Sequence, residues 1–359
     1  MPFSVSPQHL TDLARRLAQR GALSEARHIM TLAKRFHIAA KIQRGEKPVI
    51  YIAATSDDEK DEFMKFLWGD YWVQYELIKG FGSLGYRVSK INPDVVIHLY
   101  GHPRQLPQHT YNIIWIYSNP ATIRNGEDLR QYDWIYVLSE SYQKVVQDMG
   151  RQADVMIGAT SKTPFPACSN LYPAVFVGNA RRGKGNRPVV ECLRQCSYPF
   201  KVWGNGWEHF LSPDCIGGRY HDYQQLDRLY AHSDFSLNDH HADMRSYGFV
   251  AVKIFDILAS GGFAISDKNC GIEPIFGDTV PQFADAKELQ AIFDRYAPGR
   301  EAREVLLKKG REIALSHTWE DRTMTFMQKL EAEWEWASLS REIETVVQLH
   351  QGGHGIPPR

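Results

Sequence analysis

The residues from Asn238 to Asp256 combine side chains that could hold a nucleoside diphosphate. Lys253 and Asp256 lie three positions apart, so on a helix they share one face. A lysine there can meet a diphosphate, and a carboxylate can accept hydrogen bonds from ribose hydroxyls. Two further polar residues, Asp239 and His240, lie in the loop that precedes this helix. We take Asp239, His240 and Lys253 as the candidate catalytic residues.

The elements around these residues form a βαβ unit. Positions 234–237 predict a strand, and positions 246–260 predict a helix because their apolar residues recur near the helical period. Gly261 and Gly262 end that helix, and positions 263–265 predict a buried strand. A polar loop that leads into a helix N-terminus presents free N–H groups and the positive end of the dipole. Both features suit a phosphate.

A plainer alternative exists for Lys253 and Asp256. They could form a solvated pair on an ordinary amphipathic helix, because surface ion pairs are common and weak. However, the polar residues at 238–245 directly follow a predicted parallel strand. Ligands in open α/β sheets bind at the carboxyl ends of strands. That position favours a binding site.

A second segment with potential for anion binding is the glycine-rich basic loop G-N-A-R-R-G-K-G-N-R at 178–187. It lies between a predicted strand at 174–177 and a helix that starts at Pro188. Glycines let backbone approach a phosphate closely, and Arg or Lys supplies charge. The loop is neither a Walker loop nor the dinucleotide fingerprint. A flexible surface turn is the alternative, but the position between strand and helix favours an anion site.

The first half of the chain alternates short apolar strands with helices, which is the pattern of a doubly wound parallel sheet. The predicted strands are 49–53, 86–88, 95–99, 113–117 and 134–138.

Four residues of this half are candidates for the acceptor side of a cleft: Gly69, Asp70, His98 and Asn119. His98 and Asn119 lie at strand ends, which face the cleft in such sheets. Gly69 and Asp70 open a helix, where Asp70 could equally be an N-cap. Each of these residues, taken alone, has a structural explanation as well.

The chain divides into five predicted parts. Residues 1–46 contain a helical hairpin at 8–44, which we interpret as a cap on the first domain; a surface for docking a partner protein is the alternative. The first sheet domain spans 47–168 and the second spans 169–318. Residues 319–350 are predicted helices that cross back to the first domain, and 351–359 a disordered tail.

Composition excludes several classes of protein. The 359 residues carry 42 Lys plus Arg and 42 Asp plus Glu, so a large nucleic-acid footprint, which needs a basic surplus, is not expected. The five cysteines show no zinc-type pairing, and we expect buried thiols and no metal site. No apolar signal core and no long apolar run are present, so we expect a cytoplasmic enzyme without a transmembrane segment.

Several motifs together resemble the CgeB-like branch of the group 1 glycosyltransferases, which have the GT-B fold. The main one is L-N-D-H-H-A-D-M-R-S-Y-G-F-V-A-V-K-I-F-D-I-L-A-S-G, and W-G-D-Y-W, N-I-I-W-I-Y-S-N-P, V-F-V-G-N and W-G-N-G-W support it. The resemblance implies two Rossmann-like domains that face a cleft. It also implies transfer of a sugar from a nucleoside-diphosphate sugar of the UDP or GDP type, with no separate cofactor, to a glycan, protein or small-molecule acceptor.

The resemblance also implies a set of donor-binding residues. In the family a cation from the basic loop neutralises the leaving diphosphate, and Arg181 and Lys184 are the candidates here. Tyr220 and the turn at Gly204 resemble segments that hold the nucleobase. The full set implied is Gly178, Asn179, Arg181, Lys184, Gly204, Tyr220, Asn238, Asp243, Met244, Arg245, Gly248, Phe249, Lys253, Asp256, Gly271 and Glu273.

The mechanism implied is metal-independent transfer with retention of anomeric configuration. One departure affects this expectation: related enzymes often carry a Glu separated by seven residues from the helix carboxylate, and Gly248 stands there. Asp239 or Asp243 could supply the missing contact. Two alternatives to a transferase are a nucleotide-sugar-binding scaffold without turnover and a GT-B epimerase.

Overall fold

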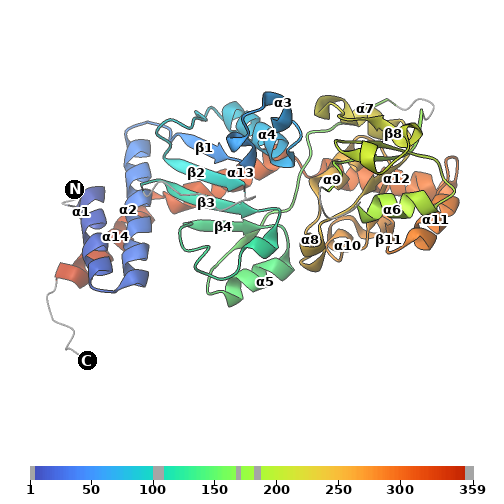
Figure 1. The fold of residues 1–359 in the computed structure, drawn as a ribbon. Coiled ribbons are helices and arrows are strands. Elements are labelled where there is room, and N and C mark those ends of the chain that lie inside the picture. The colour runs from blue at the N-terminus through green and yellow to red at the C-terminus, as the bar shows by residue number, and fades with distance from the viewer. Residues whose placement is uncertain (1–4, 100–108, 167–170, 182–186, 352–359) are drawn as a thin grey trace.

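The computed structural model describes residues 5–99, 109–166, 171–181 and 187–351, which form two parallel β-sheets with flanking helices (Figure 1). The sheets lie side by side along the long axis of the molecule, and the N-terminal helices stand at one end. The candidate Lys184 and most of the predicted tail at 351–359 lie outside the described residues.

The N-terminal sheet contains β1 (Ile50–Ala53), β2 (Val95–Leu99), β3 (Tyr111–Ile116), β4 (Trp134–Val137) and β5 (Asp154–Val155), paired in that order and all parallel. Strands β2 and β3 are buried along their whole length, as expected for parallel strands covered on both faces.

The segment predicted as a strand at 86–88 forms one parallel bridge, between Val88 and Ile50 on the outer edge of β1. The chain therefore reverses its direction of travel across the sheet at β1, and a reversal of this kind makes a sheet doubly wound.

The C-terminal sheet contains β6 (Tyr172–Val177), β7 (Phe200–Trp203), β8 (Ile216–Gly218), β9 (Ser233–Asn238), β10 (Ala264–Asp267) and β11 (Gln282–Phe283). Its strand order is β11-β10-β9-β6-β7-β8, and all pairs are parallel. The chain first moves outward from β6 and then crosses to β9 on the other side. The crevice between the carboxyl ends of β6 and β9 is therefore the switch point where ligands bind in such sheets.

Helices connect and cover these strands. The N-terminal sheet carries α3 (Glu62–Lys65), α4 (Gly69–Ser83) and α5 (Glu140–Asp148), and the C-terminal sheet carries α6 (Pro188–Gln195), α7 (Leu226–Ala231), α10 (Ile272–Phe276), α11 (Ala286–Arg295) and α12 (Glu301–Leu315).

The helix predicted at 246–260 begins later, as α9 (Val252–Ala259), and a separate short helix, α8 (Ala242–Ser246), lies in the segment predicted as a polar loop. Gly248 lies between them with φ of 69°, a left-handed conformation that interrupts the helical path. The predicted start at 246 is wrong because apolar residues persist through the turn and keep the helical period there.

Helix α13 (Trp319–Glu333) returns from the C-terminal sheet and packs on α4 of the N-terminal half. Arg322 connects α13 to the segment at 157–158, because its guanidinium donates to the carbonyls of Ile157 at 2.8 Å and Gly158 at 3.0 Å. Thr160 and Thr318 form a parallel bridge beside it. The two segments that join the halves of the molecule therefore run next to each other.

The hairpin consists of α1 (Pro7–Gln19) and α2 (Leu23–Gln43), and α2 also contacts α14 (Trp336–Gln351) and β3. Its buried residues belong to the same hydrophobic cluster as the N-terminal sheet. Arg35 of α2 pairs with Glu333 at 3.0 Å and Glu342 at 2.8 Å. The hairpin is thus packed as part of the N-terminal half. Docking of a partner protein stays a prediction.

Candidate active site

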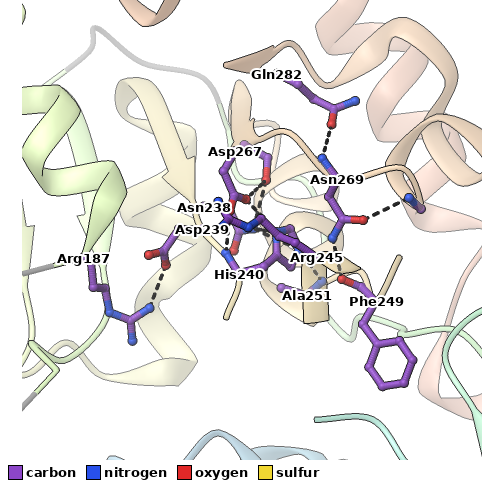
Figure 2. Close-up of polar contacts among 12 residues, drawn as sticks. Arg187, Asn238, Asp239, His240, Arg245, Phe249, Ala251, Asp267, Asn269 and Gln282 are labelled. Carbon is purple, nitrogen blue, oxygen red and sulfur yellow. Dashed lines mark hydrogen bonds and ion pairs between the residues drawn. The ribbon is translucent and has the colours of Figure 1, made fainter. Parts of the chain in front are cut away.

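The switch point of the C-terminal sheet joins the two loops that the sequence singled out. Arg187, directly before α6, donates through Nη1 to Asp239 Oδ1 at 2.7 Å and through Nε to the Asn179 carbonyl at 2.7 Å (Figure 2). The Asp239 side chain is fully buried, and Arg181 Nη2 lies 3.5 Å from its other oxygen. The Asp239 carboxylate therefore holds the basic loop against the end of β9, with one oxygen hydrogen bonded to Arg187 and the other 3.5 Å from Arg181. These contacts give Asp239 a positioning role, and its catalytic role stays a prediction.

His240 is fixed by hydrogen bonds on both ring nitrogens (Figure 2). Nε2 accepts from the Ala251 backbone N–H at 3.1 Å, so the proton is on Nδ1, which donates to Asp267 Oδ1 at 2.6 Å. The side chain is completely buried. Both ring nitrogens are therefore engaged within the protein, and a catalytic role for His240 stays a prediction. Its hydrogen bonds connect the end of β10 to the start of α9.

Asn269 locks the next loop in the same way. Its side-chain amide donates to the Phe249 carbonyl at 2.7 Å, and its Oδ1 accepts from Gly271 N at 2.9 Å (Figure 2). A Cβ on Gly271 would collide with the Gly248 carbonyl. A Cβ on Gly248 would lie 3.2 Å from Cys270 Sγ, and its φ is positive. The tight approach of these two loops leaves little room for a side chain at Gly248.

A basic hollow of about 290 Å³ opens beside Arg187, between the two halves of the molecule. Its cations are Arg187, Arg219 and Lys253, and none of its described lining residues is Asp or Glu. Its other lining residues include Phe66, Gly69, Trp72, Gly178, Asn179, Trp203, Gly204, Tyr220, His221 and Tyr223. Positive charge without a lining carboxylate makes this hollow suited to an anion, and the aromatic side chains suit a planar ring.

Lys253 is the central cation of this hollow. Burial and the neighbouring Arg187 lower the pKa of its ammonium to about 8. Its Nζ lies 4.5 Å from the centre of the Phe176 ring, and among the described residues no carboxylate is within ion-pair distance of it. A bound anion would supply the missing partner and raise this pKa.

An apolar hollow of about 270 Å³ adjoins the basic one, and Lys253 lines both. Its wall is mainly hydrophobic, with Val73, Tyr117, Leu138, Met244, Val250 and Trp319. Lys253 and Asp256 are the charged residues of its described lining.

Asp256 faces this apolar hollow and the segment that joins the two halves. Its Oδ1 accepts from Thr160 Oγ1 at 2.6 Å, and burial raises the pKa of the carboxyl to about 7. Asp256 therefore shares a helix face with Lys253 as predicted, but it is buried and is not half of a solvated surface pair. Its contact with ribose stays a prediction.

The other predicted residues divide into three groups. Gly178, Asn179, Gly204 and Tyr220 line the basic hollow, and Met244 lines the apolar one. A second group is engaged within the protein: Arg181 donates to the His240 carbonyl, Asn238 to Ser266, and Arg245 lies 3.6 Å from Asp267. The remaining residues, Asp243, Phe249, Gly271 and Glu273, line neither hollow.

On the acceptor side, Gly69 lines both hollows and the other three candidates line neither. Asp70 is not an N-cap; it accepts from the backbone N–H groups of Thr55 and Ser56, and burial raises its pKa. His98 Nε2 lies 3.4 Å from Asn112 Oδ1 inside the sheet. Asn119 adopts a left-handed conformation at a turn, with φ of 49°. Internal contacts thus account for Asp70 and His98.

The sequence reasoning missed the aromatic contact that closes the cleft. Trp72 of α4 stacks on Tyr223 of the C-terminal half, with ring centres 4.4 Å apart. Ser139, at the start of α5, donates to the Tyr247 carbonyl at 2.5 Å on the opposite rim. These contacts join residues more than 100 positions apart, so no local pattern signals them.

A family model matches most of the C-terminal half. Residues 181–328 are similar to a family described as glycosyl transferase-like. The glycosyl transferase-like segment contains β7 to β11, α9 and the Arg187–Asp239 pair. A comparison with curated proteins found no match.

Solved structures that cover 79–80% of the chain show the GT-B fold, which confirms the predicted fold class. Sucrose-phosphate synthase from Thermosynechococcus elongatus has 13% identity and a TM-score of 0.59, over 79% of this chain and 98% of that chain. T4 phage BGT in complex with its UDP-glucose substrate has 11% identity and a TM-score of 0.52, over 79% and 99%. AviGT4, a glycosyltransferase involved in avilamycin A biosynthesis, has 14% identity and a TM-score of 0.53, over 80% and 98%.

In the described part of the chain, no three His, Cys, Asp or Glu side chains lie close enough together to hold a metal ion. No described helix is both long enough and apolar enough to cross a bilayer.

Proposed function

We propose that this protein transfers a sugar from a nucleoside-diphosphate sugar to an acceptor. The observation that carries the proposal is the basic hollow beside the switch point of the second sheet, which is lined by three cations and by no described carboxylate. The glycosyl transferase-like match over residues 181–328 supports it. A diphosphate bound there would face Lys253 and Arg187, and the base would lie among the aromatic residues around Tyr220.

The chemistry that these residues can supply is electrostatic. Cations aimed at the leaving diphosphate stabilise the charge that develops as the bond to the sugar breaks, and they act strongly in a partly buried site. Lys253 and Arg187 would fill this role without a metal ion. With His240 locked in its neutral form, the acceptor proton would pass to an oxygen of the leaving diphosphate. This path suits the retention of configuration that the family resemblance implies.

Asp256 has a restricted part in this proposal. Thr160 occupies one of its oxygens, and Asp256 lines the apolar hollow and not the basic one, so the hollow in which the diphosphate would lie gives no support to the predicted contact with ribose.

The proposal is tested by calorimetric titration of the full chain with UDP and GDP, followed by an assay for release of the diphosphate from UDP- and GDP-sugars. We expect micromolar to millimolar binding of one diphosphate and its slow release from the matching sugar nucleotide. Turnover should persist in EDTA. Failure of both nucleotides to bind would refute the proposal. Binding without release would favour the scaffold, and interconversion of the sugar nucleotide without release would favour the epimerase.

A further inference from the structure

The two hollows that meet at Lys253 differ in chemistry. The basic hollow is lined by cations, histidine and asparagine together with aromatic rings. The apolar hollow is walled by Val73, Leu138, Met244 and Val250, each of which is almost completely buried. One cleft therefore offers two neighbouring environments, and a ligand that bridges them must be charged at one end and apolar at the other.

Few polar groups are available inside the apolar hollow. The Ser118 side chain hydrogen bonds to Tyr117, and Thr160 occupies one oxygen of Asp256. A buried hydroxyl without a partner costs about 1–3 kcal/mol. A sugar ring carries several hydroxyls, so it would lose more free energy in this hollow than an aromatic or aliphatic group of the same size.

Both halves of the molecule contribute to the walls of the apolar hollow. Tyr117 and Leu138 lie directly after β3 and β4, at the carboxyl edge of the N-terminal sheet. Met244 and Val250 close the hollow from the glycosyl transferase-like segment. A ligand here would lie across the cleft from the basic hollow, next to Lys253.

We propose that the apolar hollow binds the acceptor, and that this acceptor carries its hydroxyl on an aromatic or aliphatic group. The inference rests on the proposed function. The acceptor oxygen forms a bond to the anomeric carbon, the bond from that carbon to the diphosphate oxygen breaks, and the hydroxyl proton goes to the diphosphate. The size agrees, because an apolar cavity of roughly 150 Å³ already holds benzene, and this hollow measures about 270 Å³.

The experiment uses 2-naphthol as an aromatic alcohol and glucose as a polar one. Binding of each to the full chain is measured by saturation-transfer NMR, with and without saturating UDP. We expect 2-naphthol to bind and to stay bound at saturating UDP, because the cations Arg187 and Arg219 line the basic hollow and not the apolar one. Glucose should give no signal at the same concentration.

Met244→Gln tests the location, because it places an amide of similar length in the apolar wall. It should weaken naphthol binding roughly tenfold, since a buried amide without a partner is unfavourable. Met324→Gln is the matched control, because Met324 is 39% exposed on α13 and lines neither hollow. UDP affinity should be unchanged in Met324→Gln, and thermal melting checks that both variants are folded.

Three results would overturn the inference: no naphthol binding, glucose binding as strong as naphthol binding, or displacement of naphthol by UDP. Displacement would assign the apolar hollow to the donor. These results differ from failure of the proposed function, in which UDP itself does not bind. If Met244→Gln fails to fold, the competition experiment on the unaltered chain decides the question.

Discussion

The two sheets face each other across one cleft, but their carboxyl edges are built differently. At the C-terminal edge, buried carboxylates hold charged and polar side chains in fixed positions: Asp239 holds Arg187 and Asp267 holds His240. At the N-terminal edge, Asp70 turns inward to bind backbone N–H groups, and apolar side chains face the cleft. Two edges with the same topology thus present opposite chemistry.

This difference shows that a carboxylate near a cleft is not necessarily a ligand. Asp239 and Asp267 are as buried as Asp70, and all three bind protein groups. The group that lacks a carboxylate partner among the described residues is Lys253. We therefore expect anion binding at the C-terminal edge to depend on Lys253, because the buried carboxylates Asp239 and Asp267 pair with other groups.

The largest effect should come from replacing His240, whose ring hydrogen bonds to Asp267 and to the Ala251 N–H. His240→Leu leaves the Asp267 carboxylate and the Ala251 N–H without their partner, so we expect the free energy of unfolding to fall by roughly 3–5 kcal/mol. Urea denaturation measures this, with His209→Leu as the control because that side chain is 74% exposed. A decrease in the free energy of unfolding below about 0.5 kcal/mol would show that the hydrogen bonds of His240 contribute little to the stability of the C-terminal half.

The second largest effect should come from replacing Arg187, the cation that Asp239 holds in place. Arg187→Gln removes a charge from the basic hollow, and we expect UDP affinity to fall roughly ten- to a hundredfold, since a charge-assisted bond contributes about 1.5–3 kcal/mol. Arg194→Gln is the control, because Arg194 forms an exposed pair with Glu191 on α6. Equal UDP affinity in both variants would remove Arg187 from the donor site.

Lys253 also predicts a dependence of binding on pH. Its pKa of about 8 in the free protein means that the ammonium is charged at pH 7 and mostly neutral at pH 9. A diphosphate prefers the charged form, so UDP affinity should fall roughly tenfold between these values. The Lys253→Met variant should show no such fall. An affinity of the unaltered chain that stays constant from pH 7 to 9 would contradict the assignment.

The smallest effect is expected on the N-terminal edge. Asp70→Asn keeps an oxygen for the Thr55 and Ser56 N–H groups and removes a carboxylate whose pKa burial already raises. We expect UDP affinity to change less than about twofold and the free energy of unfolding by less than about 1 kcal/mol. A tenfold loss of UDP affinity would place Asp70 in the donor site and erase the contrast between the edges.

The sequence predicted the strands and the switch-point loops well because their signals are local. Runs such as 95–99 and 113–117 are apolar throughout, and parallel strands buried on both faces require that. The polar loop at 238–245 follows such a strand directly. These patterns need no knowledge of distant residues.

The roles of single residues could not be predicted because distant partners decide them. Asp267, 27 positions after His240, engages one ring nitrogen of that histidine within the protein. Arg181 and Arg187 lie in the same loop, and only their placement shows that Arg187 lines the basic hollow. The positive φ of Gly248 delays the start of the predicted helix to Val252, although the apolar period begins before it.

The most direct test of the account is the affinity of UDP for Lys253→Met. Methionine preserves length and burial and removes the charge, so calorimetry should show a loss of roughly ten- to a hundredfold relative to the unaltered chain. Lys308→Met, on an exposed position of α12, should bind UDP normally. If Lys253→Met binds UDP as tightly as the unaltered chain does, the diphosphate does not lie in the basic hollow and the central claim is wrong.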